Sequence, residues 1–225
     1  MSVLPAAPLL VAPDGPVDDM AFTKELLSAV AAKEPPAALR LYEPPRTVAF
    51  GRRETHRAGY RAAVDAARRH GFGPVVRNAG GLAVAYGPGS LVVELLAADP
   101  SPPDGLRARF AAFAAGIAAA LRAVGVDAEV GELPGEYCPG EFSVRAGTVK
   151  LAGTAQRLVA GAWLCSASVV VTGAAELRAV LAEVNEHLGF GWRPGTLGGA
   201  ADLVPGLTTG AVAAALERTF GGRRA

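Results

Sequence analysis

The chain has 225 residues, 51% of them hydrophobic, and its 22 lysines and arginines against 21 aspartates and glutamates leave it almost neutral. This length fits one large domain, and the hydrophobic fraction is ample for a sizeable core. The balanced charge gives no reason to expect binding to nucleic acid or to an anionic membrane. The chain has two cysteines in different kinds of segment, so the sequence does not indicate a disulfide-stabilised fold. This fits a reducing, cytoplasmic location.

Residues 1–17 are predicted to form an N-terminal arm ahead of a single domain, residues 18–225. The arm is apolar, but it is too short and too interrupted by proline to span a bilayer. It also lacks the basic start of a signal peptide. We therefore expect a partly ordered arm and no membrane segment.

Helices and strands are predicted to alternate along the domain, from apolar spacing and from glycine and proline at the turns. Residues 82–86 and 91–96 are expected to pair as a hairpin, with both faces covered. Helices are expected at 18–32, 58–70, 106–124, 174–188 and from Thr208 or Thr209 to about 220, and further strands at 39–42, 46–50, 75–77, 127–130, 142–145, 148–151 and 161–172. The predicted class is α+β, a mixed and mainly antiparallel sheet packed with helices.

Cys138 lies in a loop bracketed by Pro134-Gly135 and Pro139-Gly140, and the strands at 142–145 and 148–151 follow it. If Ser143 pairs opposite Lys150, the loop can fold back and bring the thiol near the ammonium. A nearby cation favours the thiolate, which is the nucleophilic form of cysteine. Cys138 and Lys150 are therefore a candidate nucleophile and activator. The alternative is a loop cysteine and a solvated lysine that never meet.

A second informative stretch is Arg77-Asn78-Ala79-Gly80-Gly81, directly after a predicted strand. Paired glycines let the backbone approach a ligand closely and present amide groups to its oxygen atoms. Arg77 can add a charge-assisted contact. No helix follows, so the stretch is not a dinucleotide-binding fingerprint, and an ordinary structural turn is the alternative reading.

Together these stretches resemble the lipoate–protein ligase and octanoyltransferase family, which shares the biotin/lipoate ligase catalytic fold. The likeness rests on Arg77-x-x-Gly80-Gly81-x-Ala83-Val84 and on Lys150-x-x-Gly153-x-Ala155-Gln156, and residues 46–52 are similar to the family's strand-then-glycine segment. Tyr137-Cys138-Pro139-Gly140 most resembles the cysteine-dependent octanoyl/lipoyl amidotransferases of Gram-positive bacteria.

The resemblance implies that Cys138 takes an acyl group as a thioester and passes it to a lysine of a lipoyl domain. Lys150 would contact the acyl carbonyl and help to hold the thiolate. The implied partners are lipoyl-domain or glycine-cleavage carrier proteins and a donor of the octanoyl or lipoyl group, with no cofactor required. The implied acyl-site residues are Arg77, Gly80, Gly81, Leu82, Gly153 and Ala155.

Two alternatives stay open: an ATP-dependent lipoate–protein ligase, which would use ATP and magnesium, and a non-catalytic paralogue that binds an acyl chain or a lipoyl domain. Such ligases usually carry His-Asp where this chain has Tyr86-Gly87, and often Asn-Asp where it has Phe142-Ser143. Both departures favour transfer. The position of Ser143 is commonly acidic in the transferases too, so its role stays open.

The other conspicuous residues have structural interpretations. Cys165 shares one strand face with Trp163 and is expected to be a small buried side chain. The three histidines share no spacing with acidic residues, so no metal site is expected. Glu141 is expected to face water, and solvated positions are expected for Arg52, Arg53, Arg107 and Arg109.

Overall fold

The computed structural model describes residues 3–10, 18–77 and 79–221. Its strands are β1 (Leu9–Leu10), β2 (Ala37–Tyr42), β3 (Thr47–Phe50), β4 (Gly73–Val76), β5 (Val84–Tyr86), β6 (Ser90–Ala98), β7 (Glu129–Val130), β8 (Val144–Ala146), β9 (Val149–Val159) and β10 (Ala162–Val170). Its helices are α1 (Asp19–Ala31), α2 (Tyr60–Arg69), α3 (Leu106–Arg122), α4 (Ala174–Leu188), α5 (Ala200–Leu203) and α6 (Thr209–Phe220), with short 3-10 helices η1 (Glu54–His56) and η2 (Pro194–Thr196).

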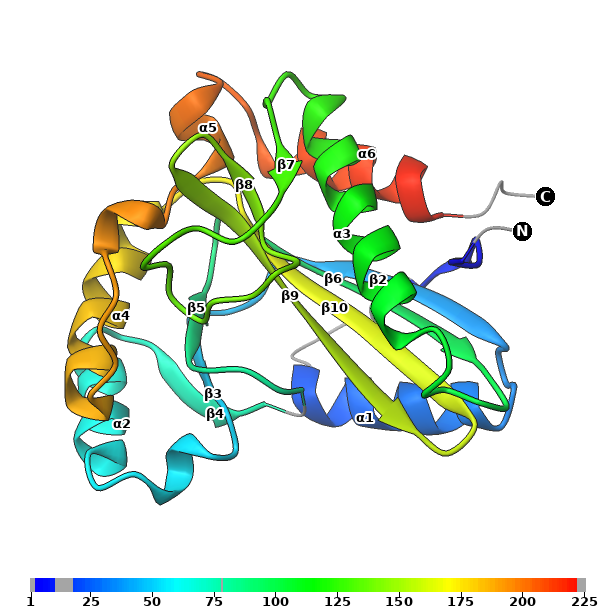
Figure 1. The fold of residues 1–225 in the computed structure, drawn as a ribbon, viewed down its shortest axis with the longest axis horizontal. Coiled ribbons are helices and arrows are strands. Elements are labelled where there is room, and N and C mark those ends of the chain that lie inside the picture. Colours follow the sequence, from blue (N-terminus) through cyan, green and yellow to red (C-terminus); the bar gives the residue numbers. More distant parts are fainter. Residues whose placement is uncertain (1–2, 11–17, 78, 222–225) are drawn as a thin grey trace.

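These strands form two sheets (Figure 1). The larger has seven strands in the order β1-β2-β6-β10-β9-β8-β7, and every pairing except that of β1 with β2 is antiparallel. The smaller has the order β4-β3-β5. The predicted class, a mixed and mainly antiparallel sheet packed with helices, is confirmed.

Helices cover both faces of the large sheet (Figure 1). On one face lie α3 and α6, and the rings of Phe113 and Phe220 from these helices are 5.1 Å apart. On the other lies α1, which packs Leu26 and Val30 against strands β2, β6 and β10. Asp18 begins α1, because its side chain accepts hydrogen bonds from the backbone N–H groups of Met20 and Ala21.

The small sheet has its own core with α2 and α4. The helix α2 buries Ala63, Ala66 and Ala67 in this core, and Tyr60 and Val64 of the same helix pack against it partly buried. Figure 1 shows these two helices side by side, away from α3 and α6. Most buried side chains of the large sheet belong to other clusters, but Val92 of β6 and Val170 of β10 join the core of the small sheet.

The hairpin predicted from residues 82–86 and 91–96 is wrong. The strand β5 pairs with β3 in the small sheet, whereas β6 lies between β2 and β10 in the large one. The turn between them is tied to the end of β10, because the carbonyl of Gly89 accepts from the N–H groups of Val171 and Thr172. Gly89 has φ +88°, and a Cβ there would lie 2.2 Å from the Thr172 hydroxyl. This long-range contact directs the chain from one sheet to the other.

The described part of the N-terminal arm adds to the large sheet. Leu9 and Leu10 pair with β2, and Ala7 forms a bridge with Gly221. Residues 11–17 lie outside the described residues, so the predicted boundary at residue 18 stays a prediction. Within the described residues, none of the helices combines the length and apolar character that crossing a bilayer requires.

Candidate active site

A cavity of about 320 Å³, called the central cavity below, lies between the two sheets. Its wall is built from α1, from β3 and β5 of the small sheet, and from β6, β9 and β10 of the large one. Cys138 and Lys150 both line it, as does the glycine loop, residues 79–81. Segments separated by more than a hundred residues thus converge here.

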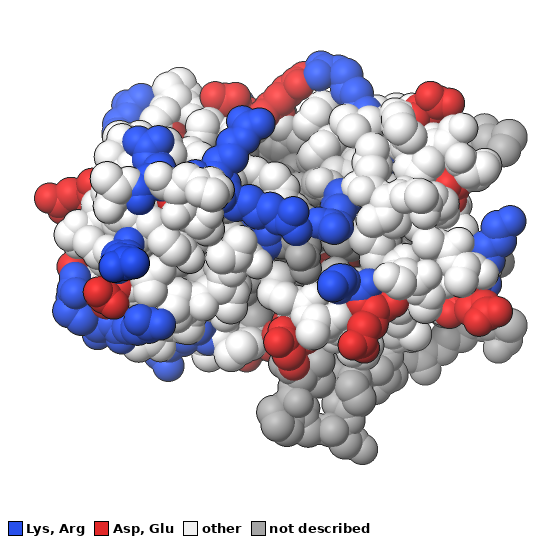
Figure 2. Space-filling model, turned by 90° about the horizontal axis from the view of Figure 1, so that it is seen from below, with Lys and Arg blue, Asp and Glu red and all other residues white. Residues whose placement is uncertain are grey.

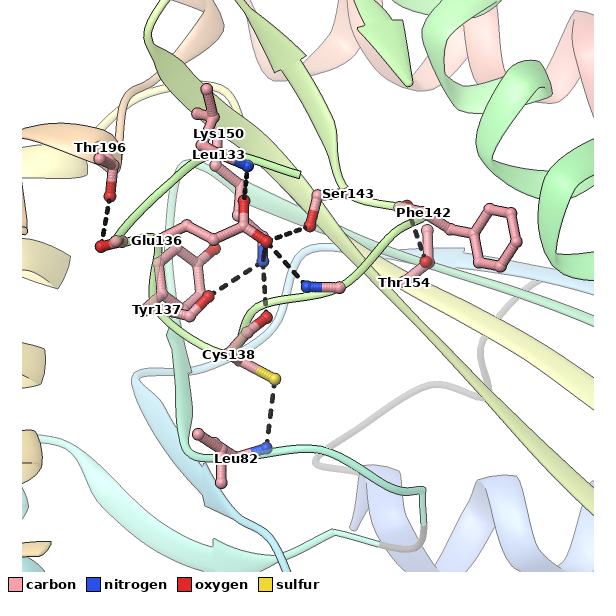
Figure 3. Close-up of polar contacts among 12 residues, drawn as sticks. Leu82, Leu133, Glu136, Tyr137, Cys138, Phe142, Ser143, Lys150, Thr154 and Thr196 are labelled. Atoms are coloured by element: carbon pink, nitrogen blue, oxygen red, sulfur yellow. Dashed lines mark hydrogen bonds and ion pairs between the residues drawn. The ribbon is translucent and has the colours of Figure 1, made fainter. Parts of the chain in front are cut away.

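The Cys138 thiol points toward the backbone N–H of Leu82, directly after the glycine loop in the chain (Figure 3). Its Sγ lies 3.2 Å from the backbone N–H of Leu82 and 3.5 Å from the Arg77 guanidinium. Cys138 has φ +42°, in the left-handed region that residues other than glycine rarely adopt. Both contacting groups are hydrogen-bond donors, and one of them is a cation.

Lys150 is 1% exposed, and all three N–H groups of its ammonium have partners. It donates to the backbone carbonyls of Tyr137 at 3.0 Å and of Cys138 at 2.9 Å. Its Nζ also lies 3.3 Å from a carboxylate oxygen of Glu136. Burial lowers the pKa of Lys150, and the charges of Glu136 and Cys138 partly oppose that effect.

Cys138 and Lys150 therefore meet, but through the Cys138 carbonyl. The cation in contact with the sulfur is Arg77. The expected register is wrong, since Arg145 pairs with Lys150, and the ladder shifts between Val144 and Arg145. The Arg145–Lys150 pair follows from the turn, which pairs Ala146 with Val149, and the irregularity lies one step further from the turn. Ser143 lies just before β8.

Glu136 is a site residue that sequence reasoning missed. Its side chain is 0% exposed, and its carboxylate accepts from the N–H groups of Leu133 and Gly140 and from the Ser143 hydroxyl. These bonds, rather than a Ser143–Lys150 pair, close the Cys138 loop. The signal was an acidic residue inside a loop of turn residues, where unpaired backbone N–H groups need an acceptor.

A second missed carboxylate supports the glycine loop from the other side. Glu54 of η1 is 1% exposed and accepts from the N–H of Gly51 at 2.6 Å and of Ala83 at 2.9 Å. It joins the end of β3 to the residues that follow the glycine loop. Gly51 itself lies so close that a Cβ there would be 2.2 Å from the carbonyl oxygen of Gly81.

Comparison with known families agrees with this geometry. The chain matches the lipoyl protein ligase A/B catalytic domain over residues 15–188. It belongs to that family.

Curated relatives within the lipoyl protein ligase A/B family are octanoyltransferases. The octanoyl-[GcvH]:protein N-octanoyltransferase of Geobacillus kaustophilus is 32% identical over 179 residues, which are 78% of this chain and 63% of the relative. That of Anoxybacillus flavithermus is 30% identical, over 71% of this chain and 57% of the relative. The chain thus spans about six tenths of the length of these relatives.

Solved structures of lipoate ligases share the fold. A putative lipoate protein ligase from T. acidophilum with bound lipoic acid has a TM-score of 0.73 and 23% identity, covering 96% of this chain and 84% of that one. A lipoate-protein ligase A bound with ATP has a TM-score of 0.70 and 22% identity at the same coverage. These likenesses confirm a lipoate ligase catalytic-domain fold.

Most of the candidate residues of this lipoyl ligase-like chain lie around the central cavity. Leu82 is the exception, since it does not line the cavity and instead offers its backbone N–H to the thiol. The cavity-lining candidates are Cys138, Lys150, Arg77, Gly80, Gly81, Gly153 and Ala155. Their roles in catalysis and acyl binding stay predictions.

Cys165 is 0% exposed, as predicted, and burial raises the pKa of its thiol to about 12. Arg107 pairs with Glu141 at the surface, in keeping with the expectation for both. The prediction for Arg109 is wrong: this arginine is 4% exposed and donates to the backbone carbonyls of Pro102 and Asp104. The described residues include no group of three or more His, Cys, Asp or Glu placed to hold a metal ion.

Gly81→Ala is expected to slow alkylation of Cys138 by iodoacetamide by ~10-fold or more, since small misplacements of reacting groups have effects of this size. Gly81 has φ +101°, and a Cβ there would lie 2.1 Å from the Arg77 guanidinium and 2.9 Å from the Cys138 sulfur. The control is Gly80→Ala, because a Cβ at Gly80 meets nothing within 4 Å. Equal rates in the two variants would contradict the inferred thiolate site.

Proposed function

We propose that this protein is an enzyme that transfers an octanoyl or lipoyl group, through a thioester on Cys138, onto a lysine of a carrier protein. The observation that carries the proposal is the Cys138 thiol, 3.2 Å from a backbone N–H and 3.5 Å from a guanidinium in the wall of the central cavity. The octanoyltransferases that this chain resembles supply the substrate class. They also point to glycine-cleavage or lipoyl carriers as partners.

In the first half-reaction the Cys138 thiolate attacks the acyl carbonyl of the donor and a carbon–sulfur bond forms. The bond from the acyl carbon to the donor's leaving group breaks, and that group takes up the proton that the thiol released. The Leu82 N–H and the Arg77 guanidinium lie beside the sulfur and stabilise its charge before attack. For Lys150 to donate to the acyl carbonyl, its ammonium has to exchange one of its present three contacts.

In the second half-reaction the amine of the acceptor lysine attacks the thioester, a carbon–nitrogen bond forms and the carbon–sulfur bond breaks. Sulfur leaves as a thiolate, which returns to the same two donors, and the amine loses a proton. No nucleotide is consumed in either half, since the first half exchanges the acyl bond of the donor for the thioester and the second exchanges the thioester for the bond to the acceptor amine. ATP and magnesium are therefore not part of the proposed reaction.

The acceptor lysine has to reach the opening of the central cavity, so the carrier docks on the surface around it. Figure 2 shows a band of Lys and Arg side chains across the middle of one face of the molecule. A positive surface of this kind attracts an acidic partner and speeds its encounter. The reduced thiol that the mechanism needs suits the cytoplasm, which we propose as the location.

The test is intact mass spectrometry after mixing the protein with an octanoylated carrier, with and without ATP and magnesium. We expect the protein to gain the mass of one octanoyl group without ATP, and hydroxylamine to remove it, as a thioester requires. A protein that gains mass only with free octanoate and ATP would be an ATP-dependent ligase. A protein that binds the carrier and gains no mass under either condition would be non-catalytic.

A further inference from the structure

We infer that Glu136 is a positioning residue, whose buried carboxylate holds the ammonium of Lys150 against the backbone of Cys138 and so acts on acyl transfer through that lysine. The inference rests on the proposed function, because it assigns Glu136 a part in acyl transfer. None of the motifs in the sequence includes this residue, and the sequence signal for it was only its position inside a loop of turn residues.

Glu136 lies at the centre of the hydrogen bonds that shape the Cys138 loop (Figure 3). Its Oε1 accepts from Ser143 Oγ at 2.7 Å and from the Gly140 N–H at 2.9 Å, and lies 3.3 Å from Lys150 Nζ. Its Oε2 accepts from the Leu133 N–H at 3.3 Å. Leu133 and Gly140 stand on opposite sides of Cys138 in the chain. One carboxylate therefore fixes both ends of the loop and the lysine beneath it.

Lys150 and Glu136 form a buried ion pair, and either charge without the other would destabilise the fold. The side chains of Lys150 and Glu136 are 1% and 0% exposed. An ion in such a place needs a partner of opposite sign and hydrogen bonds to its remaining atoms. Glu136 receives both, from one cation, two backbone N–H groups and one hydroxyl. This arrangement fixes the ammonium within reach of the Cys138 carbonyl.

Four groups lie close to the Lys150 ammonium, and three of them affect its pKa. Glu136 and the Cys138 thiol raise its pKa, Arg77 lowers it, and the Tyr137 ring lies 4.6 Å from Nζ. Burial has the largest effect and lowers the pKa. Removing the Glu136 charge therefore lowers the pKa of Lys150 further, so that the ammonium loses its proton at a lower pH.

Glu136→Gln is the main test, because it keeps the size of the side chain and removes its charge, with an NH2 group in place of one of the two accepting oxygens. We expect the single-turnover rate of Cys138 acylation at neutral pH to fall by ~10- to 100-fold, part of what a positioned proton donor contributes. The alkaline limb of the rate profile should move to lower pH, with the KM for the octanoylated carrier changed less than ~2-fold. A folded variant with the wild-type pH profile overturns the inference, since Glu136 would then only hold the loop.

Ser143→Ala is the matched control. It removes one hydrogen bond to the same carboxylate and leaves both charges in place. We expect the rate to fall less than it does in Glu136→Gln, with no displacement of the pH profile, because the carboxylate and the ammonium both remain. A displacement as large as that of Glu136→Gln would contradict a role for the charge itself.

A second-site carboxylate can show whether Glu136 acts by positioning Lys150 or only by maintaining the fold. Ser143 Oγ lies 2.7 Å from Glu136 Oε1, so Ser143→Asp can place a carboxylate near the position that Glu136→Ala vacates. We expect Glu136→Ala to lose the activity and the double variant Glu136→Ala/Ser143→Asp to regain ~10-fold or more of it. A double variant that folds and stays as inactive as Glu136→Ala overturns the inference, including where Glu136→Gln fails to fold.

Failure of the proposed function gives a different result. Wild-type protein that never acquires an acyl group contradicts acyl transfer itself. The link between Glu136 and Lys150 is then read from NMR of 13Cε-labelled lysine, in which Glu136→Gln should move the Lys150 titration to lower pH. An unmoved titration overturns the link.

Discussion

Cys138→Ser is expected to abolish the acyl-enzyme and to lower transfer by ~1,000-fold or more, since the nucleophile of a covalent mechanism carries most of its rate enhancement. A serine hydroxyl in the same place can still meet the Leu82 N–H and Arg77. It is far less acidic than a thiol and stays protonated beside them. Intact mass and a transfer assay onto a carrier protein measure the two effects.

Cys165→Ser is the control for this substitution. Cys165 is 0% exposed, lies in the core cluster with Trp163 and does not itself line the central cavity, although its sulfur lies 3.5 Å from the Gln156 amide of the cavity wall. A hydroxyl buried there should lower the free energy of unfolding by ~1–3 kcal/mol and leave the acylation of Cys138 unchanged. Wild-type transfer by Cys138→Ser would remove the thioester mechanism and favour an ATP-dependent reaction.

Lys150→Ala is expected to have the second large effect, on both stability and activity. It removes three contacts and leaves the Glu136 carboxylate buried without its cation. Losing one partner of a buried pair lowers the free energy of unfolding by ~3–5 kcal/mol. Acyl transfer should be lost, because the carbonyls of Tyr137 and Cys138 lose their donor and the acyl carbonyl loses a cation. Thermal unfolding and the transfer assay measure these changes.

A double variant separates the two losses. Lys150→Met/Glu136→Gln removes both charges together, and replacing a whole buried pair is often nearly neutral for stability. We expect most of the lost stability to return and transfer to stay absent. The variant Lys150→Arg should also lose transfer activity, since a planar guanidinium does not reproduce three tetrahedral N–H groups. Recovery of transfer in the double variant would reduce Lys150 to a structural residue.

Features that depend on neighbouring residues were predictable from the sequence. The prediction of a helix at 174–188 coincides with α4, because its apolar spacing and its terminal glycines are local signals. Asp18 begins α1 for the same kind of reason. The stretches around Cys138, Lys150 and the glycine loop identified the family, since a motif is a local pattern.

Features that depend on distant contacts were decided only by the tertiary structure. The strands β5 and β6 separate into two sheets because Gly89 is bound to the end of β10, more than eighty residues further on. Lys150 lies opposite Arg145 because the turn pairs Ala146 with Val149, a register that apolar patterns do not specify.

The same division holds within the candidate site. The sequence by itself determined that a thiol, a lysine, an arginine and paired glycines occur in one recognisable pattern. Only the tertiary structure decided that Arg77 contacts the sulfur and that Glu136 anchors the lysine. The physical reason is burial: a carboxylate removed from water has to find its donors wherever the packed chain places them, and no local pattern records that.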